Sequence, residues 1–363
     1  LKSDPGSSQG EGGGSRARPQ RPPRARPSAM DDWLRGLQRG PMPVGERDRE
    51  AEVDSASNER LRAGACSARG LRPSNEDQHV MDCDWCSGGA AGLFAVLDGH
   101  GGPAVAILAS RLLANHLRGE LEAEEGAVPR WSTEDGRRDA AQRAFVALDK
   151  QLSTKEVAHG CGSTCVAAVV WPEGEEGAEA GPDGPDYRVL LANLGDSRGL
   201  VVRGRNGAPA REDEQTVDLL AETQDHKPSL PEERRRIVEA GGTVTGLFGP
   251  PRVDGDLSLS RAFGDFRLKT AADLAPERQK ISSQPDVYEV TCRRGDMLVL
   301  ACDGAFDVMT SLEVAALARQ KLGLSGPEAP ERPGDPAVAA EAVVQAALDR
   351  GTMDNVTCVV VQL

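Results

Sequence analysis

Carboxylate residues occur at four widely separated places in the sequence, each beside an apolar run typical of a β-strand. The four motifs are Arg72-Pro-Ser-Asn-Glu-Asp77, Asp98-Gly-His-Gly-Gly102, Asp303-Gly304 and Asp354-Asn355. A carboxylate beside a core is costly to desolvate unless a positive group holds it. Because hard divalent cations prefer oxygen ligands, the convergence of four such motifs predicts a metal centre. A pair of hydrated cations at one site can cleave phosphoesters.

The segment Asp98–Gly102 follows the apolar run Leu93–Leu97 and precedes an apolar stretch typical of a helix. The end of the strand would present Asp98, and the absence of a side chain at Gly99 lets a backbone carbonyl approach a metal ion closely. His100 is near enough to donate a proton to a leaving group at the same centre. Taken alone, the motif is explained equally well by a strand-to-helix turn in which Asp98 caps the helix.

Glu76 and Asp77 are adjacent carboxylates, and adjacent side chains in a strand face opposite sides. Only one of the two can therefore be a direct ligand on the core face. Arg72 lies four residues before Glu76 and could hold a phosphate with both arms of its guanidinium group. Taken alone, this motif is better explained by a charge cluster on the surface.

Asp303 ends the apolar run Met297–Cys302, and a charge in that position is hard to explain unless it is paired. Asp354 precedes the last predicted strand, which begins at Asn355. Taken alone, Asp354 is better explained as a turn residue. The four motifs together favour the metal centre over their separate structural explanations.

Apolar periodicity predicts strands in neighbouring pairs, with helices in pairs between them. The predicted strands are 92–97, 165–171, 187–194, 200–203, 287–291, 297–301 and 355–362. The predicted helices follow Pro103, cover 134–152, begin near Pro231, and cover 311–322 and 336–350. Ser229–Glu232 and Thr310–Glu313 have the spacing of capping boxes, and Asp335 precedes a proline at a helix start. This order indicates an α+β fold in which antiparallel sheets have helices packed outside.

Residues 1–60 are rich in Gly, Pro, Arg and charge, and this composition cannot bury a core. We therefore expect a disordered N-terminal tail, followed from residue 61 by one folded domain. Three polar insertions, 172–186, 204–218 and 323–336, are expected to be surface loops without catalytic residues.

The composition excludes several classes of partner. With 363 residues, of which 39% are hydrophobic and 28% charged, the chain is typical of a soluble globular protein. A net charge of -14 and an aromatic content of 3% argue against binding to nucleic acids or anionic membranes. No apolar run approaches the ~20 residues of a membrane span, and no signal-peptide core is present at the N-terminus.

The eight cysteines show no regular disulfide spacing, and several of them lie in strand-like runs. Buried free thiols in a reducing compartment explain this best, so we expect an intracellular protein, cytoplasmic or nuclear. Cys83 and Cys86 form a C-x-x-C pair, but a zinc site would need a second pair. Cys161 with Cys165 is poorly suited because Cys165 lies in a predicted strand.

In this order the motifs resemble the metal-dependent protein serine/threonine phosphatases of type 2C, the PPM family. The resemblance runs over about 300 residues, from Ala63 to Leu363. It includes the motifs Gly162-Ser-Thr164, Asn193-Leu-Gly-Asp-Ser-Arg198, Asp225-His-Lys-Pro228, Glu239-Ala-Gly-Gly242, Leu259-Ser-Arg-Ala-Phe-Gly-Asp265 and Gln284-Pro-Asp286. It implies an αββα sandwich for residues 61–363, with two antiparallel sheets flanked by pairs of helices. It also implies two Mn²⁺ or Mg²⁺ ions in a monomeric catalytic domain.

The activity implied by this resemblance is hydrolysis of phosphoserine and phosphothreonine in protein substrates, by a water or hydroxide that bridges the two metal ions. Asp98 would bridge both ions, and the Gly99 carbonyl would bind one of them. The other ion's ligands would be completed by Glu76, Asp303 and Asp354.

The resemblance also implies roles for residues around the metal ions. Asp77 would orient water from behind the ligands, Arg72 would grip the substrate phosphate, and His100 would protonate the leaving serine or threonine oxygen. Asp196 and Asp307 match positions that hold a third, weaker metal in the family. Phe306 stands where the family usually has tryptophan, which predicts a change in packing that leaves the carboxylates intact.

Two other functions remain open. A catalytically inactive scaffold of the same fold, which binds phosphoproteins or kinases, would be favoured by loss of ligand carboxylates, and none is lost here. A hydrolase of small phosphoesters would share all of the metal chemistry. Only a comparison of turnover on phosphoproteins and on small molecules would separate it from a protein phosphatase.

Overall fold

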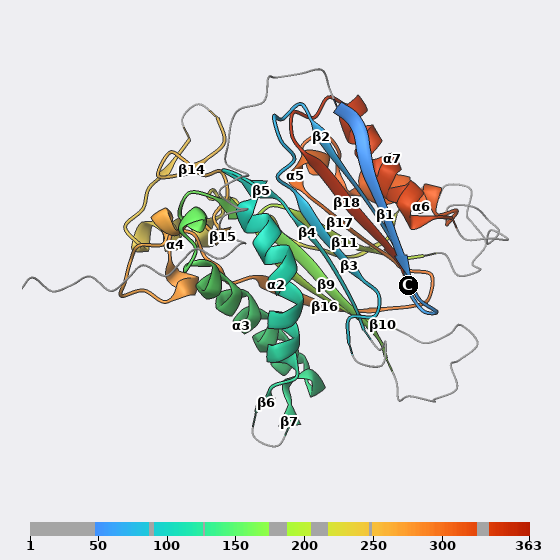
Figure 1. Ribbon diagram of the computed structural model, residues 1–363, viewed down its shortest axis with the longest axis horizontal. Helices are drawn as coiled ribbons and strands as arrows, with labels where there is room; N and C mark the ends of the chain where they lie inside the picture. The colour runs from blue at the N-terminus through green and yellow to red at the C-terminus, as the bar shows by residue number, and fades with distance from the viewer. Residues whose placement is uncertain are drawn as a thin grey trace, which may run out of the picture.

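The computed structural model describes residues 48–86, 91–125, 128–173, 187–204, 217–246, 249–324 and 334–363. In this part of the chain, two large antiparallel sheets contain most of the strand residues (Figure 1). Residues 1–47 of the predicted tail, and most of the three predicted insertions, lie outside the described residues. Among the helices of the described ranges, none is long and apolar enough to cross a membrane.

The larger sheet has six strands, and each neighbouring pair is antiparallel. Their order across the sheet is β1 (Asp48–Ser57), β2 (Arg62–Gly70), β18 (Val356–Gln362), β17 (Met297–Ala301), β11 (Arg198–Val202) and β12 (Leu219–Glu222). The second sheet has five antiparallel strands. Their order is β16 (Asp286–Cys292), β10 (Tyr187–Leu194), β9 (Cys165–Pro172), β4 (Gly92–Leu97) and β3 (Gln78–Asp82).

Strand β1 corrects the predicted boundary of the tail at residue 60. It pairs with β2 from Asp48↔Gly70 to Ser57↔Arg62 and forms the outer strand of the six-stranded sheet. The strand is mostly polar and charged, and its Val53 side chain is 45% exposed. An outer strand buries little, so its sequence lacks the apolar pattern by which strands are found. For the same reason the half-exposed β3 and β12 were missed.

Four helices cover the outer faces of the two sheets. Figure 1 shows α2 (Ala104–Leu121) and α3 (Glu134–Leu152) on one side of the strands, and α6 (Ser311–Lys321) and α7 (Pro336–Asp349) on the other. One apolar cluster joins α2 and α3 to the five-stranded sheet, and a second joins α6 and α7 to the six-stranded sheet. A third cluster contains residues of both sheets and none of these four helices.

Alternation along single strands explains why these clusters separate. In β17, Met297, Val299 and Ala301 pack toward the helices, whereas Leu298 and Leu300 belong to the cluster shared by the sheets. Successive side chains of a strand point to opposite faces, so a strand covered on both faces is apolar throughout. The continuous apolar runs of the sequence, which predicted β4, β9, β10, β17 and β18 correctly, have this origin.

Two of the three predicted helix caps are confirmed. Thr310 and Glu313 form a complete capping box at the start of α6, and the Asp335 side chain accepts a hydrogen bond from Ala337 N at the start of α7. The capping box predicted at Ser229 is wrong. Helix α4 (Pro231–Glu239) begins at Pro231 with Leu230 as its N-cap, so Ser229 stands one residue too early to cap it.

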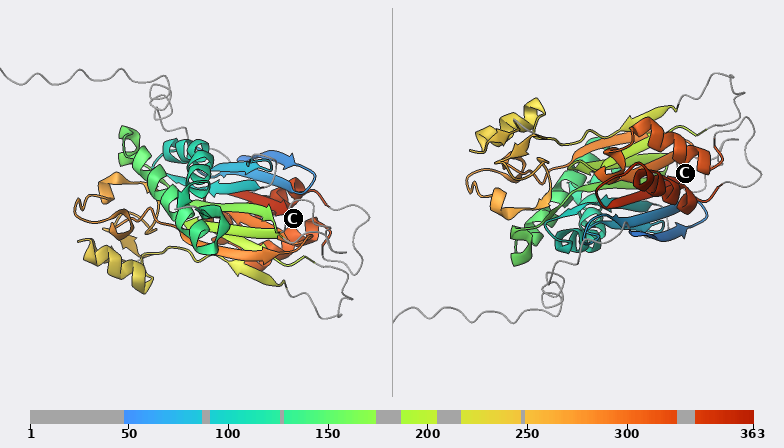
Figure 2. Two further views of the ribbon diagram at one scale, coloured as in Figure 1. Left: turned by 90° about the horizontal axis from the view of Figure 1, so that it is seen from below. Right: turned by 90° about the horizontal axis from the view of Figure 1, so that it is seen from above.

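Shorter elements connect these layers. They are β5 (Gly99–His100), β6 (Glu124–Glu125), β7 (Val128–Pro129), β8 (Gly162–Ser163), β13 (Val244–Thr245), β14 (Arg252–Val253), β15 (Phe263–Gly264), α5 (Asp303–Phe306) and four 3-10 turns at 130–132, 156–159, 266–268 and 276–278. We call the described residues between β12 and β16 the flap segment. Figure 2 shows this yellow-to-orange segment at one end of the molecule.

Candidate metal centre and phosphate site

Strand ends and the loops beside them bring the predicted carboxylates together. Asp98 follows β4, Asp303 opens α5 directly after β17, and Asp354 lies just before β18. Burial, the largest influence, raises the pKa of Asp98 well above its usual range, and the charges of Asp77, Asp303, Asp196 and Asp354 raise it further. Such mutual repulsion requires that these carboxylates lie close together. The structure therefore places in one cluster residues that are up to 277 positions apart, Asp77 and Asp354.

Several oxygens of this cluster lack protein partners. Asp303 Oδ1 and Asp77 Oδ1 are buried and have no hydrogen-bond partner in the described part of the chain. Burial, followed by the charges of Asp196 and Asp307, raises the pKa of Asp303 well above its usual range. Buried polar atoms are almost always satisfied, and unpaired carboxylate oxygens within a cluster of acids suit the binding of cations.

Asp77 lies close to Asp98 and is held by a residue of β18. Its Oδ2 accepts a hydrogen bond of 2.7 Å from the Thr357 hydroxyl in β18. Burial raises the pKa of Asp77 to about 6 despite this bond. One ligand atom each of Asp77, Asp98 and Cys302 lie within 4.8 Å of one another. Burial raises the pKa of the Cys302 thiol well above its usual range, so the thiol stays protonated and the available donors are oxygens.

Glu76 is positioned next to Gly99. Its Oε2 accepts a hydrogen bond of 2.9 Å from Gly102 N, and its Oε1 accepts one of 3.2 Å from the Ser74 hydroxyl. A Cβ atom at Gly99 would lie 2.4 Å from the Glu76 carbonyl oxygen, so only glycine fits there. Asn355 holds the same loop because its Oδ1 accepts a 2.9 Å bond from Glu76 N. Asn355 was predicted only as the start of a strand, and its contact with Glu76 was not predicted.

Arg72 lies at the exposed edge of the cluster. Its Nη2 donates to Asp354 Oδ2 at 2.5 Å, and the side chains are 53% and 24% exposed, respectively. The guanidinium group thus reaches both solvent and a predicted metal ligand. This position suits a residue that holds a phosphate beside the metal centre.

His100 contacts an acid that is not among the predicted metal ligands. Its Nε2 lies 2.7 Å from Oδ2 of Asp265, which is fully buried. Burial, the largest influence, would lower the pKa of His100, but Asp265, Asp196 and Glu76 together raise it. Asp265 belongs to a motif that the sequence analysis quoted without assigning it a role, and no local pattern marks it.

Asp196 and Asp307 lie beside Asp303, as their shared effect on its pKa shows. Asp196 is buried, and its Oδ2 accepts a hydrogen bond of 2.5 Å from Lys227 Nζ. Asp307 is exposed at the end of α5, and burial raises its pKa, followed by opposing effects of Lys227 and Asp196. The ring centroid of the neighbouring Phe306 lies 4.5 Å from the Arg198 guanidinium carbon.

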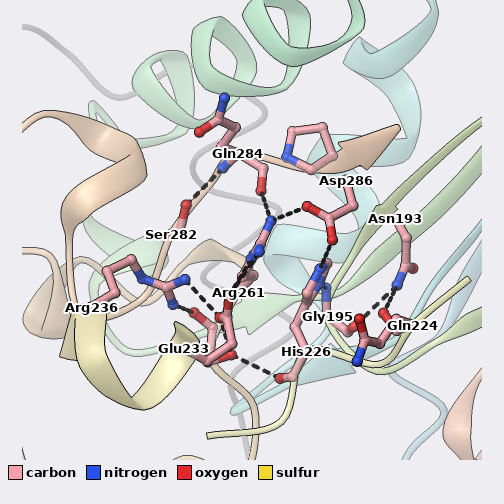
Figure 3. A network of polar contacts seen from close by, with 12 residues as sticks. Asn193, Gly195, Gln224, His226, Glu233, Arg236, Arg261, Ser282, Gln284 and Asp286 are labelled. Carbon is pink, nitrogen blue, oxygen red and sulfur yellow. Dashed lines mark hydrogen bonds and ion pairs between the residues drawn. The ribbon is translucent and has the colours of Figure 1, made fainter. Parts of the chain in front are cut away.

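A buried polar network ties the flap segment to the turn that carries Asp196 (Figure 3). Glu233 of α4 accepts hydrogen bonds from Arg261, and Arg261 Nη1 also donates to Asp286 at 2.7 Å. His226 Nε2 lies 3.2 Å from Asp286, and its Nδ1 accepts a bond of 3.0 Å from Gly195 N. Because Gly195 donates to Nδ1, the His226 proton must reside on Nε2. The network therefore ends one residue before Asp196.

Comparisons with known proteins agree with this geometry. A family model described as Protein phosphatase 2C matches residues 61–356. The chain is 36% identical over 310 residues to the probable protein phosphatase 1N of Homo sapiens, which covers 83% of this chain and 60% of that protein. It is 31% identical over 310 residues to protein phosphatase 1A of Homo sapiens, covering 83% of this chain and 70% of that protein.

A solved structure of a phosphatase from a pathogenic strain of Toxoplasma gondii matches with a TM-score of 0.66 and 26% identity, over 86% of this chain and 96% of that chain. The chain spans 60% and 66% of the length of the human and mouse phosphatase 1N proteins. The family model covers most of the residues from β2 to β18, including every predicted site residue. The chain belongs to the protein phosphatase 2C family.

Proposed function

We propose that the chain is a metal-dependent phosphatase that hydrolyses phosphoserine and phosphothreonine in proteins. The observation that carries this proposal is the cluster of buried and half-buried carboxylates around Asp98. Asp98 has no cationic partner among the described residues, and the buried Asp303 Oδ1 has no hydrogen-bond partner there. Divalent ions with oxygen ligands would satisfy both.

The residues present fit two such ions, Mn²⁺ or Mg²⁺. Asp98 would contact both ions, as the resemblance implies. Glu76 packs against Gly99 and Gly102, so we assign it to the same ion as the Gly99 carbonyl. This differs from the assignment based on resemblance, which grouped Glu76 with Asp303 and Asp354. Those two would complete the second ion.

When bound, the ions would supply a water of lowered pKa and would neutralise charge on the phosphate. The residues of the chain do the rest. Asp77, anchored by Thr357, would orient the attacking water. Arg72, half exposed at the edge, would hold the phosphate with its guanidinium group. His100 would give a proton to the serine or threonine oxygen as it leaves.

A third, weaker cation would be held by Asp196 and Asp307, which both act on the pKa of Asp303. Lys227 already places a positive charge on Asp196, 2.5 Å from its Oδ2. A metal ion at this place would therefore compete with an internal ammonium group, which supports the assignment of a weak site.

We infer that the two sheets face each other as an αββα sandwich. The support is the apolar cluster that contains residues of both sheets, together with the helix pairs on the opposite faces. All eight cysteines are free thiols and most are buried, which supports a reducing intracellular compartment, cytoplasmic or nuclear. We propose a monomeric domain that acts on phosphoprotein substrates.

The proposal is tested by hydrolysis of a phosphothreonine peptide with Mn²⁺, with Mg²⁺ and with excess chelator, in the full chain and in Asp303→Asn. We expect turnover that requires metal and falls at least about 100-fold in the variant. Asp139→Asn, which changes an exposed carboxylate of α3, should behave as the intact protein. Intact protein that binds metal without turnover would instead support the inactive scaffold.

Metal binding also has a readout that does not depend on activity. Removing one charge from a repulsive cluster should raise the melting temperature of the chelated Asp303→Asn protein above that of the intact protein. Added Mg²⁺ should reverse this order, because the intact protein gains more binding free energy than the variant. The same order with and without Mg²⁺ would refute the assignment of Asp303 as a ligand.

A further inference from the structure

Asp265 stands out as a buried acid that the proposed mechanism does not yet use. Its side chain is fully buried, whereas that of His100 is 24% exposed, and their Oδ2 and Nε2 atoms lie 2.7 Å apart. The second carboxylate oxygen, Oδ1, has no hydrogen-bond partner in the described part of the chain. The imidazole is thus the one side-chain partner that the structure gives to Asp265 there.

The backbone at Asp265 is in a conformation that nothing local requires of an aspartate. Its φ and ψ are 52° and 37°, in the left-handed region, and the preceding Gly264 also has a positive φ of 77°. A residue other than glycine in this region costs about 1–3 kcal/mol and persists only where surrounding contacts hold it. Asp265 stands at the N-cap of the turn 266–268, but its side chain makes no capping bond. The side chain is therefore directed to His100 rather than to its own turn.

Contacts with α3 hold this backbone in place. Asp149 Oδ1 accepts a bond of 2.8 Å from Gly264 N, and its Oδ2 accepts one of 2.8 Å from Lys269 Nζ. Lys269 also donates to the Ala262 carbonyl at 2.8 Å, so one buried ion pair spans the turn. Asp265 N donates to the Cys161 carbonyl at 2.9 Å. The turn is thus fixed on both sides of Asp265.

The absence of a side chain at Gly162 leaves space for the contact between Asp265 and His100. A Cβ atom there would lie 2.1 Å from Asp265 Oδ2 and 2.4 Å from His100 Nε2. Both side chains therefore rest directly on the backbone of β8, which pairs with β5 at His100↔Gly162. The imidazole is held by a short strand, a bare glycine and a buried carboxylate.

We propose that Asp265 is the positioning residue of His100: it accepts the Nε2 proton and turns Nδ1 toward the exposed side of the ring, where substrate arrives. Nδ1 has no protein partner among the described residues, and the His100 side chain is 24% exposed although the carboxylate that binds its Nε2 is fully buried. The inference rests on the proposed function. As the phosphorus–oxygen bond breaks, the leaving oxygen keeps the bonding electrons and takes the proton from Nδ1. The ring is left neutral, with its remaining proton on Nε2 shared with Asp265.

The tautomer is measured directly by long-range ¹H–¹⁵N correlation spectra of the imidazoles in the full chain, loaded with diamagnetic Mg²⁺. His100→Gln assigns the signal among the five histidines. The neutral His100 ring should carry its proton on Nε2, and Asp265→Gly should mix the two tautomers. Glycine suits the left-handed backbone and removes the carboxylate. A neutral ring in the intact protein with its proton on Nδ1 overturns the proposal, whatever the variant does.

Kinetics supply a second, independent measurement. Asp265→Asn should lower kcat on a phosphothreonine peptide by about 10- to 100-fold. A positioned general acid contributes about 100- to 10,000-fold, and the variant keeps the acid but loses part of its orientation. KM should hardly change, and an aryl phosphate, whose leaving group needs less protonation, should lose much less. Asp254→Asn is the matched control, since Asp254 is the other described aspartate with a positive φ, 50°, and it contacts Thr243 and Lys280 instead.

The two measurements separate failure of the inference from failure of the proposed function. If the proton lies on Nε2 in the intact protein and moves in Asp265→Gly, but the intact protein shows no turnover, the interaction of Asp265 with His100 is supported. The proposed phosphatase function is then refuted. If the intact protein has full turnover and Asp265→Asn loses equal activity on the phosphothreonine peptide and the aryl phosphate, the proposed phosphatase function stands. Asp265 is then rejected as the positioning residue. Equal effects of Asp254→Asn and Asp265→Asn would also reject it.

Discussion

We predict that Glu233, in the polar network of the flap segment, contributes strongly to the stability of the fold (Figure 3). Glu233 is 1% exposed and binds two arginines: Arg261 at 2.8 and 3.0 Å, and Arg236 at 2.7 Å. Glu233→Ala would leave two largely buried guanidinium groups without their shared carboxylate. Removing one partner of a buried ion pair costs about 3–5 kcal/mol. Arg261 still binds Asp286 in the variant, and both arginines still donate to backbone carbonyls. We therefore expect the free energy of unfolding to fall by about 3 kcal/mol, the lower end of this range.

The assay is thermal and urea unfolding of the chelated protein, with Glu232→Ala as control. Glu232 is the exposed neighbour of Glu233 in α4, and its removal should change the free energy of unfolding by about 0.5 kcal/mol or less. For Glu233→Ala we expect the melting temperature to fall by about 6–12 °C, at roughly 2–4 °C per kcal/mol. Hydrogen exchange would show whether the flap segment opens first. Equal stability of the two variants would refute the view that Glu233 stabilises the fold by holding these arginines.

Two further predictions concern pH and the metal centre. Burial, the largest influence, would raise the pKa of Glu233, but Arg261 and Arg236 lower it below its ordinary 4.5. Its stabilisation is therefore present above pH 4.5 and lost as the pH falls through the lower folded value, so acid unfolding curves of Glu233→Gln should depend less on pH than those of the intact protein. Gly99→Ala would place a Cβ atom 2.4 Å from the Glu76 carbonyl, and we expect calorimetry to show weakened Mg²⁺ binding. Gly119→Ala, where a Cβ meets nothing within 4 Å, should bind Mg²⁺ as the intact protein does, and equal affinity in both variants would contradict the assignment of the Gly99 carbonyl.

The sequence allowed the main carboxylates and most of the central strands to be predicted, and both for the same reason, although the buried β2, which contains Ser67 and Arg69, was missed. Strands covered on both faces have continuous apolar runs, so β4 and β17 were visible, and a charge at the end of such a run was conspicuous. Asp98 and Asp303 were found in this way. The outer strand β1 buries little, and its alternating polar residues gave no comparable signal.

Contacts between residues far apart in the sequence could not be predicted from local sequence patterns. Asn355 holds the loop of Glu76 across 279 positions, and Asp265 meets His100 across 165. Both residues stand in motifs that were noted, but their partners are set by how the strands pair and not by spacing along the chain. The capping box predicted at Ser229 failed for a local reason, because Pro231 determines where α4 begins.

Buried carboxylates of this fold fall into two kinds that the sequence does not distinguish. Glu233 and Asp149 are each matched by an arginine or lysine from the same region, and they hold segments together. Asp98 and the unpaired oxygen of Asp303 have no such partner in the described residues, and their pKa values are raised accordingly. Both kinds are acids beside apolar residues, so composition and spacing treat them alike. A buried carboxylate has a structural role where the fold places an arginine or lysine beside it, and it is a candidate metal ligand where the fold does not. Which of the two holds is decided only when segments distant in the sequence come together.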